Sequence, residues 1–278
     1  MTIREALRLA AARLEQAGVP DADVDAAYLL ASVLKEDTLA MRINGHRELA
    51  APQRAAFDAL CDRRAAREPL QYILGETEFM GLTFHVEPGV LIPRADTEIL
   101  VEKALAWMKP GARVLDIGTG SGAIAVSLAK LGRQAQVTAV DVSDRALEIA
   151  RQNAERNGAA VEFVKSDCFS ALKGRKYDMI VSNPPYISEN EMRGLMPEVT
   201  REPELALFGG ADGLDFYRRI SREAPEYLNE GGCLLFEIGW LQKDAVSALV
   251  KAHIGEPFAL RDYGQNWRVV GAKKEGAC

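Results

Sequence analysis

The chain has 278 residues, 48% of them hydrophobic and 27% charged, which is enough for two domains or one large domain with an appendage. Its net charge of −6 and pI of about 5.3 disfavour the basic surface of a duplex-binding enzyme, so a protein or small-molecule substrate fits better. No apolar run approaches the roughly 20 residues that span a bilayer, and the N-terminus lacks a signal-peptide core. We therefore expect a cytoplasmic protein without membrane contact. The scattered cysteines and histidines match no zinc or disulfide pattern, so we expect no metal: Cys61, Cys168, Cys233, Cys278, His46, His85 and His253.

Residues 1–74 are predicted to form a small helical bundle. Thr2 and Glu5 have the spacing of a capping box, and Gly18 ends the first helix. Further helices are expected at 23–34, around Leu39, and from Pro52 to a point before Pro69. The bundle is too short to be a catalytic domain by itself, so it is either a stabilising cap or a module that recognises the substrate.

Alternating apolar residues around Pro88-Gly89 predict a β-hairpin linker over 75–94. From 95 to 278 strands and helices alternate, which predicts a mostly parallel sheet covered by helices on both faces. A last antiparallel pair is expected to turn at Asp262-Tyr263-Gly264. The predicted strands are 112–117, 136–141, 161–165, 177–182, 232–238 and the pair within 257–271; the helices are 97–108, 121–131, 143–157, 214–228 and 241–253.

A glycine-rich turn joins strand 112–117 to helix 121–131. Glycines let the backbone approach a ligand closely, and the free N–H groups of a helix N-terminus attract polar ligand atoms. Asp141 ends the next strand about 20 residues later, where a carboxylate can accept from both hydroxyls of a ribose. The spacing Gly118-x-Gly120-x-x-Ala123 also fits the dinucleotide fingerprint, so the turn alone leaves a nicotinamide oxidoreductase open.

Two more carboxylates indicate the cofactor. Asp116, just before the glycines, would lie awkwardly beside a pyrophosphate but suits a ligand with an ammonium group. Asp167 follows the third strand, where it can accept from an adenine amino group. One nucleoside, one amino acid and no phosphate describe S-adenosylmethionine (SAM), although Asp116 and Asp167 could each merely cap a helix. The predicted cofactor residues are Asp116, Gly118, Thr119, Gly120, Gly122, Asp141, Val142, Ser166, Asp167 and Asn183.

Strand 177–182 ends in Asn183-Pro184-Pro185-Tyr186. Proline has no N–H, so the carbonyls of this turn stay free to accept hydrogen bonds. With the Asn183 side-chain oxygen and the Tyr186 ring, they suit a planar NH2 group, that of a primary amide or an exocyclic amine. The structural alternative is a strand terminator with a packed tyrosine.

The glycine turn, Asp141, Asp167 and the Asn-Pro-Pro-Tyr turn occur in the order typical of amino-methyltransferases, which act on adenine N6, cytosine N4 or glutamine N5. Their flanks resemble the peptide-chain release factor glutamine methyltransferases (the PrmC/HemK family) over nearly the whole chain. Ala95 departs from the family, which often has a second proline there. The segments that carry the resemblance are Gln71–Gly75, Phe79–Gly81, Leu91–Glu98, Glu202–Leu207, Gly209–Leu214, Glu237–Gly239 and Arg261–Gly264.

This resemblance implies a Rossmann-like class I methyltransferase domain, with a mostly parallel seven-stranded sheet and an antiparallel C-terminal hairpin. It also implies transfer of a methyl group from SAM, leaving S-adenosylhomocysteine, to the glutamine N5 of the Gly-Gly-Gln motif of class 1 release factors. The N-terminal bundle would then help to bind the release factor. The predicted catalytic residues are Asn183, Pro184 and Tyr186; the predicted substrate-binding residues are these three with Pro185, Arg94, Thr97 and Glu98.

An amide nitrogen is a poor nucleophile, so such a site must work by geometry. We expect the Asn183 side-chain oxygen and the Pro184 carbonyl to accept the two amide N–H bonds, with Tyr186 on the amide plane and no general base. Arg94, Thr97 and Glu98 could instead form a structural hinge and cap. A DNA or RNA amino-methyltransferase and a non-catalytic release-factor binder are the remaining alternatives; we expect a monomer that binds no nucleic acid directly.

Overall fold

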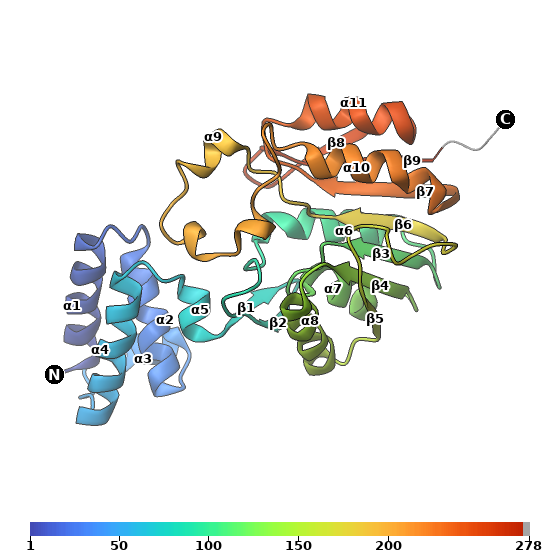
Figure 1. The fold of residues 1–278 in the computed structure, drawn as a ribbon. Coiled ribbons are helices and arrows are strands. Elements are labelled where there is room, and N and C mark those ends of the chain that lie inside the picture. Colours follow the sequence, from blue (N-terminus) through green and yellow to red (C-terminus); the bar gives the residue numbers. More distant parts are fainter. Residues whose placement is uncertain (275–278) are drawn as a thin grey trace. The chain divides into compact units, whose positions relative to one another are not determined.

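The computed structural model describes residues 1–274, and the contacts divide the chain into two compact units. The first unit comprises Met1–Glu76 together with Met196–Arg201, and the second comprises Thr77–Leu195 and the chain from Glu202 onward (Figure 1). No helix among the described residues is long and apolar enough to cross a membrane.

The first unit is a helical bundle, as predicted. The capping box is present: the Thr2 hydroxyl accepts from the Glu5 N–H, and the Glu5 carboxylate accepts from the Thr2 N–H at 2.8 Å. Leu14, Leu30 and Phe57 lie in its buried core. Its helices are α1 Ile3–Gln16, α2 Ala22–Leu34, α3 Thr38–Ile43, α4 Ala51–Ala65 and α5 Leu70–Leu74.

Segment Met196–Arg201 belongs to this bundle because a buried ion-pair network holds it there. Arg64 is only 5% exposed and donates to Asp25 at 2.7 Å and to Glu198 at 2.9 Å. Arg67 donates to both oxygens of Glu198 at 2.6 Å. Burial opposes ionisation of Glu198, but the hydrogen bonds from Arg67 and Arg64 hold its pKa at about 2. Because that pKa is depressed, the attachment is complete above the ordinary value of 4.5 and weakens as the pH falls toward 2.

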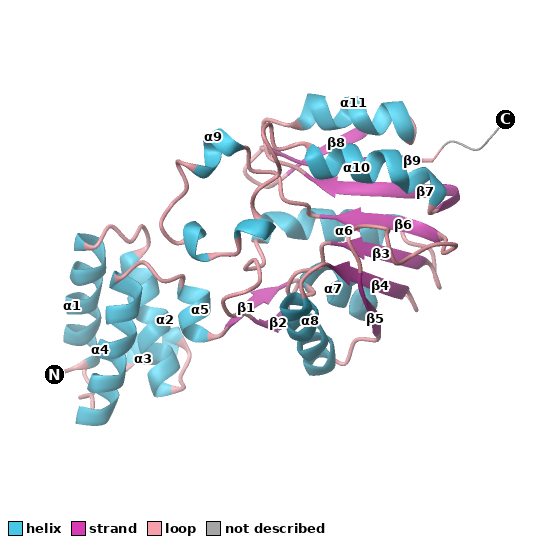
Figure 2. Cartoon of the chain, in the orientation of Figure 1, coloured by secondary structure: helices cyan, strands magenta, loops and turns pink. Residues whose placement is uncertain are grey.

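The second unit contains a seven-stranded sheet in the order β5-β4-β3-β6-β7-β9-β8. Strands β3 to β7 pair in parallel, whereas β9 is antiparallel to both β7 and β8 (Figure 2). This confirms the predicted fold class. The strands are β3 Arg113–Ile117, β4 Gln136–Asp141, β5 Val161–Lys165, β6 Tyr177–Ser182, β7 Leu228–Glu237, β8 Phe258–Arg261 and β9 Trp267–Lys273.

Two buried clusters lie on opposite faces of this sheet because neighbouring residues of a strand point to opposite sides. Val114 belongs to the cluster that includes α6 and α7, and Leu115 belongs to the cluster that includes α10 and α11. Strands covered on both faces are continuous apolar runs, which is the pattern of the central strands. The helices of the second unit are α6 Glu98–Trp107, α7 Ala123–Leu131, α8 Asp144–Asn157, α9 Glu189–Met192, α10 Asp215–Glu223 and α11 Lys243–His253; its short 3-10 turns are Ala95–Thr97, Glu204–Ala206 and Ala224–Glu226.

The chain reverses its direction of travel across the sheet between β3 and β6. From β3 it passes to β4 and then to β5 at the edge, and it returns to place β6 on the other side of β3. In open α/β sheets, ligands bind at such a switch point, outside the carboxyl ends of the strands. The topology therefore brings the turns after β3, β4 and β6 to one place.

The β-hairpin is shorter than predicted and turns at a different dipeptide. Its strands are β1 Glu76–Phe79 and β2 Leu82–His85, so the turn is Met80-Gly81 rather than Pro88-Gly89. Met80 and Gly81 both have positive φ, 51° and 70°, the requirement of a two-residue hairpin turn. Methionine is a weak signal for that conformation, which is why the sequence pattern pointed to Pro88-Gly89. Asn153 of α8 holds the hairpin, since its side chain accepts from the His85 N–H and donates to the His85 carbonyl.

Candidate active site

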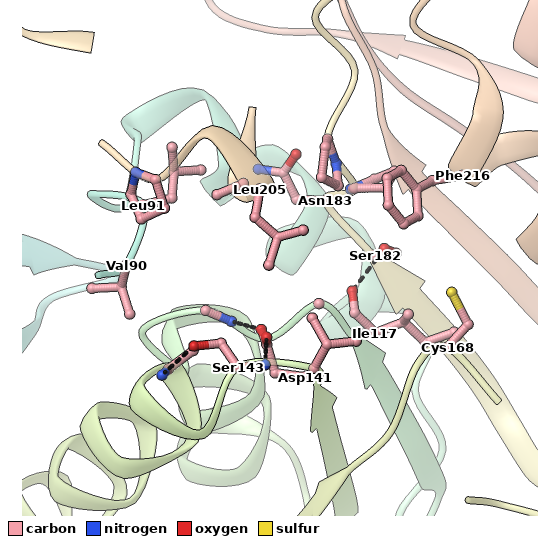
Figure 3. A pocket seen from close by; sticks show the side chains of 18 of the residues that line it. Val90, Leu91, Ile117, Asp141, Ser143, Cys168, Ser182, Asn183, Leu205 and Phe216 are labelled. Atoms are coloured by element: carbon pink, nitrogen blue, oxygen red, sulfur yellow. Dashed lines mark hydrogen bonds between the residues drawn. The ribbon is translucent and has the colours of Figure 1, made fainter. Parts of the chain in front are cut away.

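A cavity of about 150 Å³ lies at the switch point of the second unit (Figure 3). Its polar wall comes from the turns after β3, β4, β5 and β6, and its apolar wall from segments that the cofactor and tetrapeptide motifs did not include. The residues that line it are Gly89, Val90, Leu91, Ile117, Gly118, Gly120, Asp141, Val142, Ser143, Ala146, Ser166, Asp167, Cys168, Ser182, Asn183, Pro184, Pro185, Pro203, Leu205, Ala206, Phe216 and Ile220.

The glycine turn and Asp141 form a preorganised pair in this wall. Gly118 and Gly120 have φ of 73° and 54°, and a Cβ atom at either would meet nothing within 4 Å, so both face open space. The Asp141 carboxylate accepts from the Gly120 N–H and from the Ser143 N–H, each at 2.9 Å. Each carboxylate oxygen has two lone pairs, so Asp141 keeps acceptor capacity toward the cavity. This arrangement fits a ribose diol held beside an exposed backbone.

Asp116 lies beneath the turn, fully buried, and does not line the cavity. One carboxylate oxygen accepts from the Thr119 hydroxyl at 2.7 Å, and the other has no hydrogen-bond partner among residues 1–274. Burial raises the pKa of Asp116 to about 7, although the Thr119 hydrogen bond acts against this. Buried carboxylates normally have a partner, so an orphaned oxygen fits a ligand that brings a positive charge.

We expect Asp116→Asn to stabilise the ligand-free protein at alkaline pH only. The folded-state pKa of about 7 lies above the ordinary 3.8, so the wild type loses stability as the pH rises through this window. Asparagine keeps an acceptor for Thr119 and cannot ionise. The free energy of unfolding should therefore rise by on the order of 4 kcal/mol at pH 8 and by little at pH 4. Urea unfolding at the two pH values measures this, and an equal gain at both would contradict it.

Ser166 and Asp167 line the cavity at the end of β5. The Ser166 hydroxyl donates to the Cys168 carbonyl at 2.8 Å, which shapes the turn. Arg219 of α10 donates to one oxygen of Asp167 at 2.6 Å and to its carbonyl at 3.1 Å. Asp167 thus has a structural partner in Arg219, and its contact with an adenine stays a prediction.

The tetrapeptide lies opposite the glycine turn and Asp141, which together with Ser166 and Asp167 are called the cofactor wall below (Figure 3). Asn183, Pro184 and Pro185 line the cavity, whereas Tyr186 packs against the buried cluster beside α10. Burial raises the pKa of Tyr186 to about 12, so its hydroxyl stays protonated. The Asn183 side-chain nitrogen lies 3.4 Å from the Thr97 hydroxyl oxygen.

Two glycines permit the close approach of segment 207–213 to the backbone of the tetrapeptide. A Cβ atom on Gly209 would lie 2.6 Å from the Pro185 carbonyl oxygen, and one on Gly213 would lie 2.3 Å from that of Tyr186. The Gln242 amide donates to the Tyr186 carbonyl at 2.9 Å and to that of Gly213 at 3.2 Å. The position of the tetrapeptide therefore depends on residues far along the chain.

We expect Gly209→Ala to slow methyl transfer by about 10-fold, because the added methyl group would push Pro185 out of place and small displacements at a reacting centre are costly. Gly194→Ala is the matched control, since the nearest atom to its added Cβ is 3.7 Å away. Steady-state rates at saturating substrate test this. Equal rates for the two variants would show that the close contact does not position the tetrapeptide.

Arg94, Thr97 and Glu98 do not line the cavity. Arg94 pairs with the buried Glu202, which also accepts from the Ile92 N–H at 2.9 Å. Glu98 accepts from the Met80 N–H at 2.6 Å and so supports the hairpin turn. These contacts are of the hinge-and-cap kind, and binding of substrate by the three residues stays a prediction.

Several residues at this site are not among the predicted site residues. Leu205 and Phe216 form part of the apolar wall of the cavity. Glu202 and Glu237 are buried carboxyls that adjoin lining residues: Glu202 precedes Pro203, and Glu237 lies next to Asn183 across the β6–β7 pairing. A carboxyl directly after Leu234-Leu235-Phe236 is a detectable signal, because an acid at the end of a buried strand needs a reason to be there. Leu205 lies in the segment Glu202–Leu207 that carries the family resemblance, whereas Phe216 has no comparable signal.

Two family models match the chain. The model described as "PrmC N-terminal domain" matches residues 5–75, and the model described as "Methyltransferase small domain" matches residues 82–202. Among solved structures, a methyltransferase from Pyrococcus furiosus has a TM-score of 0.56 at 24% identity over 71% of this chain and 91% of its own. That likeness supports the fold alone.

Curated relatives match over the full length. The release factor glutamine methyltransferase of Geobacter sulfurreducens is 46% identical over 98% of this chain and 96% of its own length. The protein of the same name from Cereibacter sphaeroides is 43% identical over the whole of both chains. Identity at this level across both units, together with a switch-point cavity bounded by a glycine turn and an Asn-Pro-Pro-Tyr turn, shows that the chain belongs to the release factor glutamine methyltransferase family.

Proposed function

We propose that this protein transfers a methyl group from SAM to the side-chain amide nitrogen of the glutamine in the Gly-Gly-Gln motif of class 1 release factors. The observation that carries the proposal is that Asp141 and Asn183 line the same cavity at the switch point. Asp141 can accept hydrogen bonds from the hydroxyls of a ribose, and Asn183 can accept one from the NH2 group of an amide. Full-length similarity to release factor glutamine methyltransferases supports glutamine as the acceptor rather than a nucleobase. S-adenosylhomocysteine is the second product.

The cofactor wall binds and orients the methyl donor. Asp141 would accept from the ribose hydroxyls, and the exposed backbone of the glycine turn would allow the ligand to approach closely. Asp116, buried beneath that turn, would supply the negative charge for an ammonium group, and Asp167 would accept from the adenine amino group. Bound SAM supplies a methyl group activated by its positive sulfur. Apolar residues such as Leu205 and Phe216 exclude water from the cavity, which strengthens the electrostatic interactions inside it.

The tetrapeptide positions the acceptor amide. Asn183 Oδ1 and the Pro184 carbonyl accept its two N–H bonds and aim the nitrogen at the methyl carbon. Holding reactants about 3–3.5 Å apart in line contributes on the order of 7–11 kcal/mol at best. Carbonyl dipoles also favour the positive charge that develops on the nitrogen during transfer. Its proton leaves after methyl transfer, so the site requires no general base.

Three narrower statements accompany this proposal. The enzyme acts as a cytoplasmic monomer, and it makes no direct contact with nucleic acid. The helical unit binds the release factor, with its exposed Leu9, Tyr28, Leu39 and Ile43 as available apolar surface. Acidic net charge supports a protein rather than a nucleic acid as partner.

Labelled SAM and purified release factor test the proposal directly. We expect label on a wild-type release factor and none on a version with the Gly-Gly-Gln glutamine replaced by alanine. Incubation with DNA and with RNA distinguishes the nucleobase alternative. Label on nucleic acid but not on the release factor would overturn the proposal.

A further inference from the structure

A buried carboxyl that the proposed reaction does not use lies directly behind Asn183. Strands β6 and β7 run in parallel with Ser182 opposite Phe236, so the next residues lie side by side: Asn183 directly after β6, and Glu237 at the end of β7. Glu237 is 2% exposed, and its Oε2 atom has no hydrogen-bond partner among the described residues. An orphaned carboxylate oxygen at that depth is costly to maintain unless it has a task.

Two neutral donors face this carboxyl. Burial raises the pKa of Glu237 to about 7, and the Thr97 hydroxyl and the Asn183 amide, as hydrogen-bond donors, oppose this rise. Thr97 is itself buried, and its oxygen lies 3.4 Å from Asn183 Nδ2. The three side chains therefore form one polar cluster with Asn183 at the cavity and Glu237 at the interior end.

A structural ion pair does not account for Glu237. The cation that acts on Glu237 is Arg268 of β9, which lowers the pKa of Glu237. The Arg268 guanidinium, however, is bonded to Asp96 at 2.9 Å and to Asp262 at 3.0 Å. Asp96 acts on Glu237 with the opposite sign and raises its pKa. The cation is therefore already shared between two other carboxylates.

The amide of Asn183 has a donor end and an acceptor end, and methyl transfer requires the acceptor end to face the substrate. A carboxylate only accepts hydrogen bonds, so it binds the Nδ2 end and leaves Oδ1 for the cavity. We propose that Glu237 is a positioning residue which, with Thr97, holds Asn183 Nδ2 and thereby presents Asn183 Oδ1 to the NH2 group of the substrate. The inference rests on the proposed function. A charged acceptor behind Nδ2 also polarises the amide and strengthens Oδ1 as an acceptor.

Protonation of Glu237 would reverse the orientation of the Asn183 amide. The protonated carboxyl donates to Thr97, the Thr97 hydroxyl then donates to Asn183 Oδ1, and the amide turns its N–H bonds toward the substrate N–H bonds. The groups that face Glu237 are Arg268 from β9, Asp96 and Thr97 from the turn before α6, Asn183 and Tyr186 after β6, and Tyr217 from α10. Since the pKa of Glu237 is about 7, turnover should fall as the pH drops through neutrality.

Glu237→Gln tests the inference, because it keeps the volume of the side chain and removes the charge. We expect kcat for release-factor methylation to fall about 10- to 100-fold, the effect of losing one charge-assisted hydrogen bond. The Kd for SAM should stay within about twofold, and the melting temperature at pH 8 should not fall, because an uncompensated buried charge has been removed. A purely structural role predicts the opposite: a lower melting temperature and an unchanged kcat.

The reciprocal double variant makes the test specific to the pair. Asn183→Asp alone places a carboxylate next to the Glu237 carboxylate, and the two repel each other. Glu237→Gln alone places an amide next to the Asn183 amide. Combining them restores one carboxylate and one amide, with an acceptor oxygen toward the substrate. We expect the double variant to be at least about 10-fold faster than Asn183→Asp alone, the worth of one charge-assisted hydrogen bond. A double variant no faster than the poorer single variant would overturn the inference.

Two further comparisons separate an effect on the orientation of the Asn183 amide from a general disturbance of the buried core. Thr97→Val has the shape of threonine without its hydroxyl and should be slower than Thr97→Ser. Tyr217→Phe is the control, because the Tyr217 hydroxyl donates to the Glu237 backbone carbonyl at 2.9 Å and not to its carboxyl. It should lower the melting temperature and leave kcat unchanged. An equal loss of kcat in Tyr217→Phe and Glu237→Gln would contradict a role through Asn183.

The pH profile completes the experiment. With both substrates saturating, kcat of the wild type should fall on the acid side, and this fall should be absent in Glu237→Gln. Persistence of the same fall in the variant would overturn the assignment. The proposed function fails separately, if the wild type does not label the release factor. When the wild type labels it and Glu237→Gln retains kcat within twofold, only this inference fails.

Discussion

Asn183→Ala should reduce methyl transfer to the release factor by about 100- to 1000-fold. The substitution removes the acceptor that we place on the amide N–H, and loss of one preorganised transition-state contact costs that much in enzymes that stabilise developing charge. SAM should still bind, with a Kd changed by about fivefold at most, because Asn183 would offer it no more than one neutral hydrogen bond. Single-turnover rates and equilibrium binding of SAM measure the two quantities separately.

Asn229→Ala is the control for that variant. Asn229 is a half-buried asparagine near the start of β7, where its amide donates to Asp178 at 2.8 Å. It lies at the opposite end of the strand from Glu237 and does not line the cavity. We expect full activity from it. If Asn183→Ala transfers the methyl group at the wild-type rate, Asn183 does not position the acceptor amide. If Asn229→Ala is also slow, the assay reports a loss of stability and not a loss of that contact.

Asp141→Ala should weaken SAM binding by about 100-fold or more. Its carboxylate has two tasks: it accepts from Gly120 and Ser143, which fixes the glycine turn, and it faces the cavity where the ribose would lie. Removing it therefore costs direct hydrogen bonds of about 1.5–3 kcal/mol for charged partners and also loosens the turn. Titration calorimetry or fluorescence measures the Kd.

Asp144→Ala separates these effects from a general loss of negative charge. Asp144 begins α8 three positions further along, and its exposed carboxylate pairs with Lys165 at 2.5 Å. Exposed pairs of this kind contribute little, so SAM affinity should be nearly unchanged. An unchanged Kd for Asp141→Ala would exclude the ribose assignment.

Local pattern determined much of this molecule. The capping box at Thr2, the strands 136–141, 161–165 and 177–182, and the glycine turn all appear where residue type and spacing predict them. Each depends on neighbours within a few residues, through hydrophobic periodicity, a cap or a turn. The residues of the cofactor wall follow from the same logic, because the ends of parallel strands meet at one edge of a sheet.

Tertiary structure decided much of the rest. The attachment of Glu198 to Arg64 and Arg67 has no local signature, because the chain brings these residues together over a long separation. The hairpin turn at Met80-Gly81 is local, but methionine signals a positive φ only weakly, so the stronger turn dipeptide Pro88-Gly89 misled the prediction.

Tertiary structure also decided which buried side chains surround the site. Asn183 is conspicuous in the sequence, but its orientation depends on Thr97 and Glu237, which come from two other parts of the chain. A side chain's burial and the sign of the charges around it are sums over the whole fold, so no spacing rule reports them. Sequence by itself predicted which groups carry the chemistry; the fold decided where Asn183 lies and which side chains surround it.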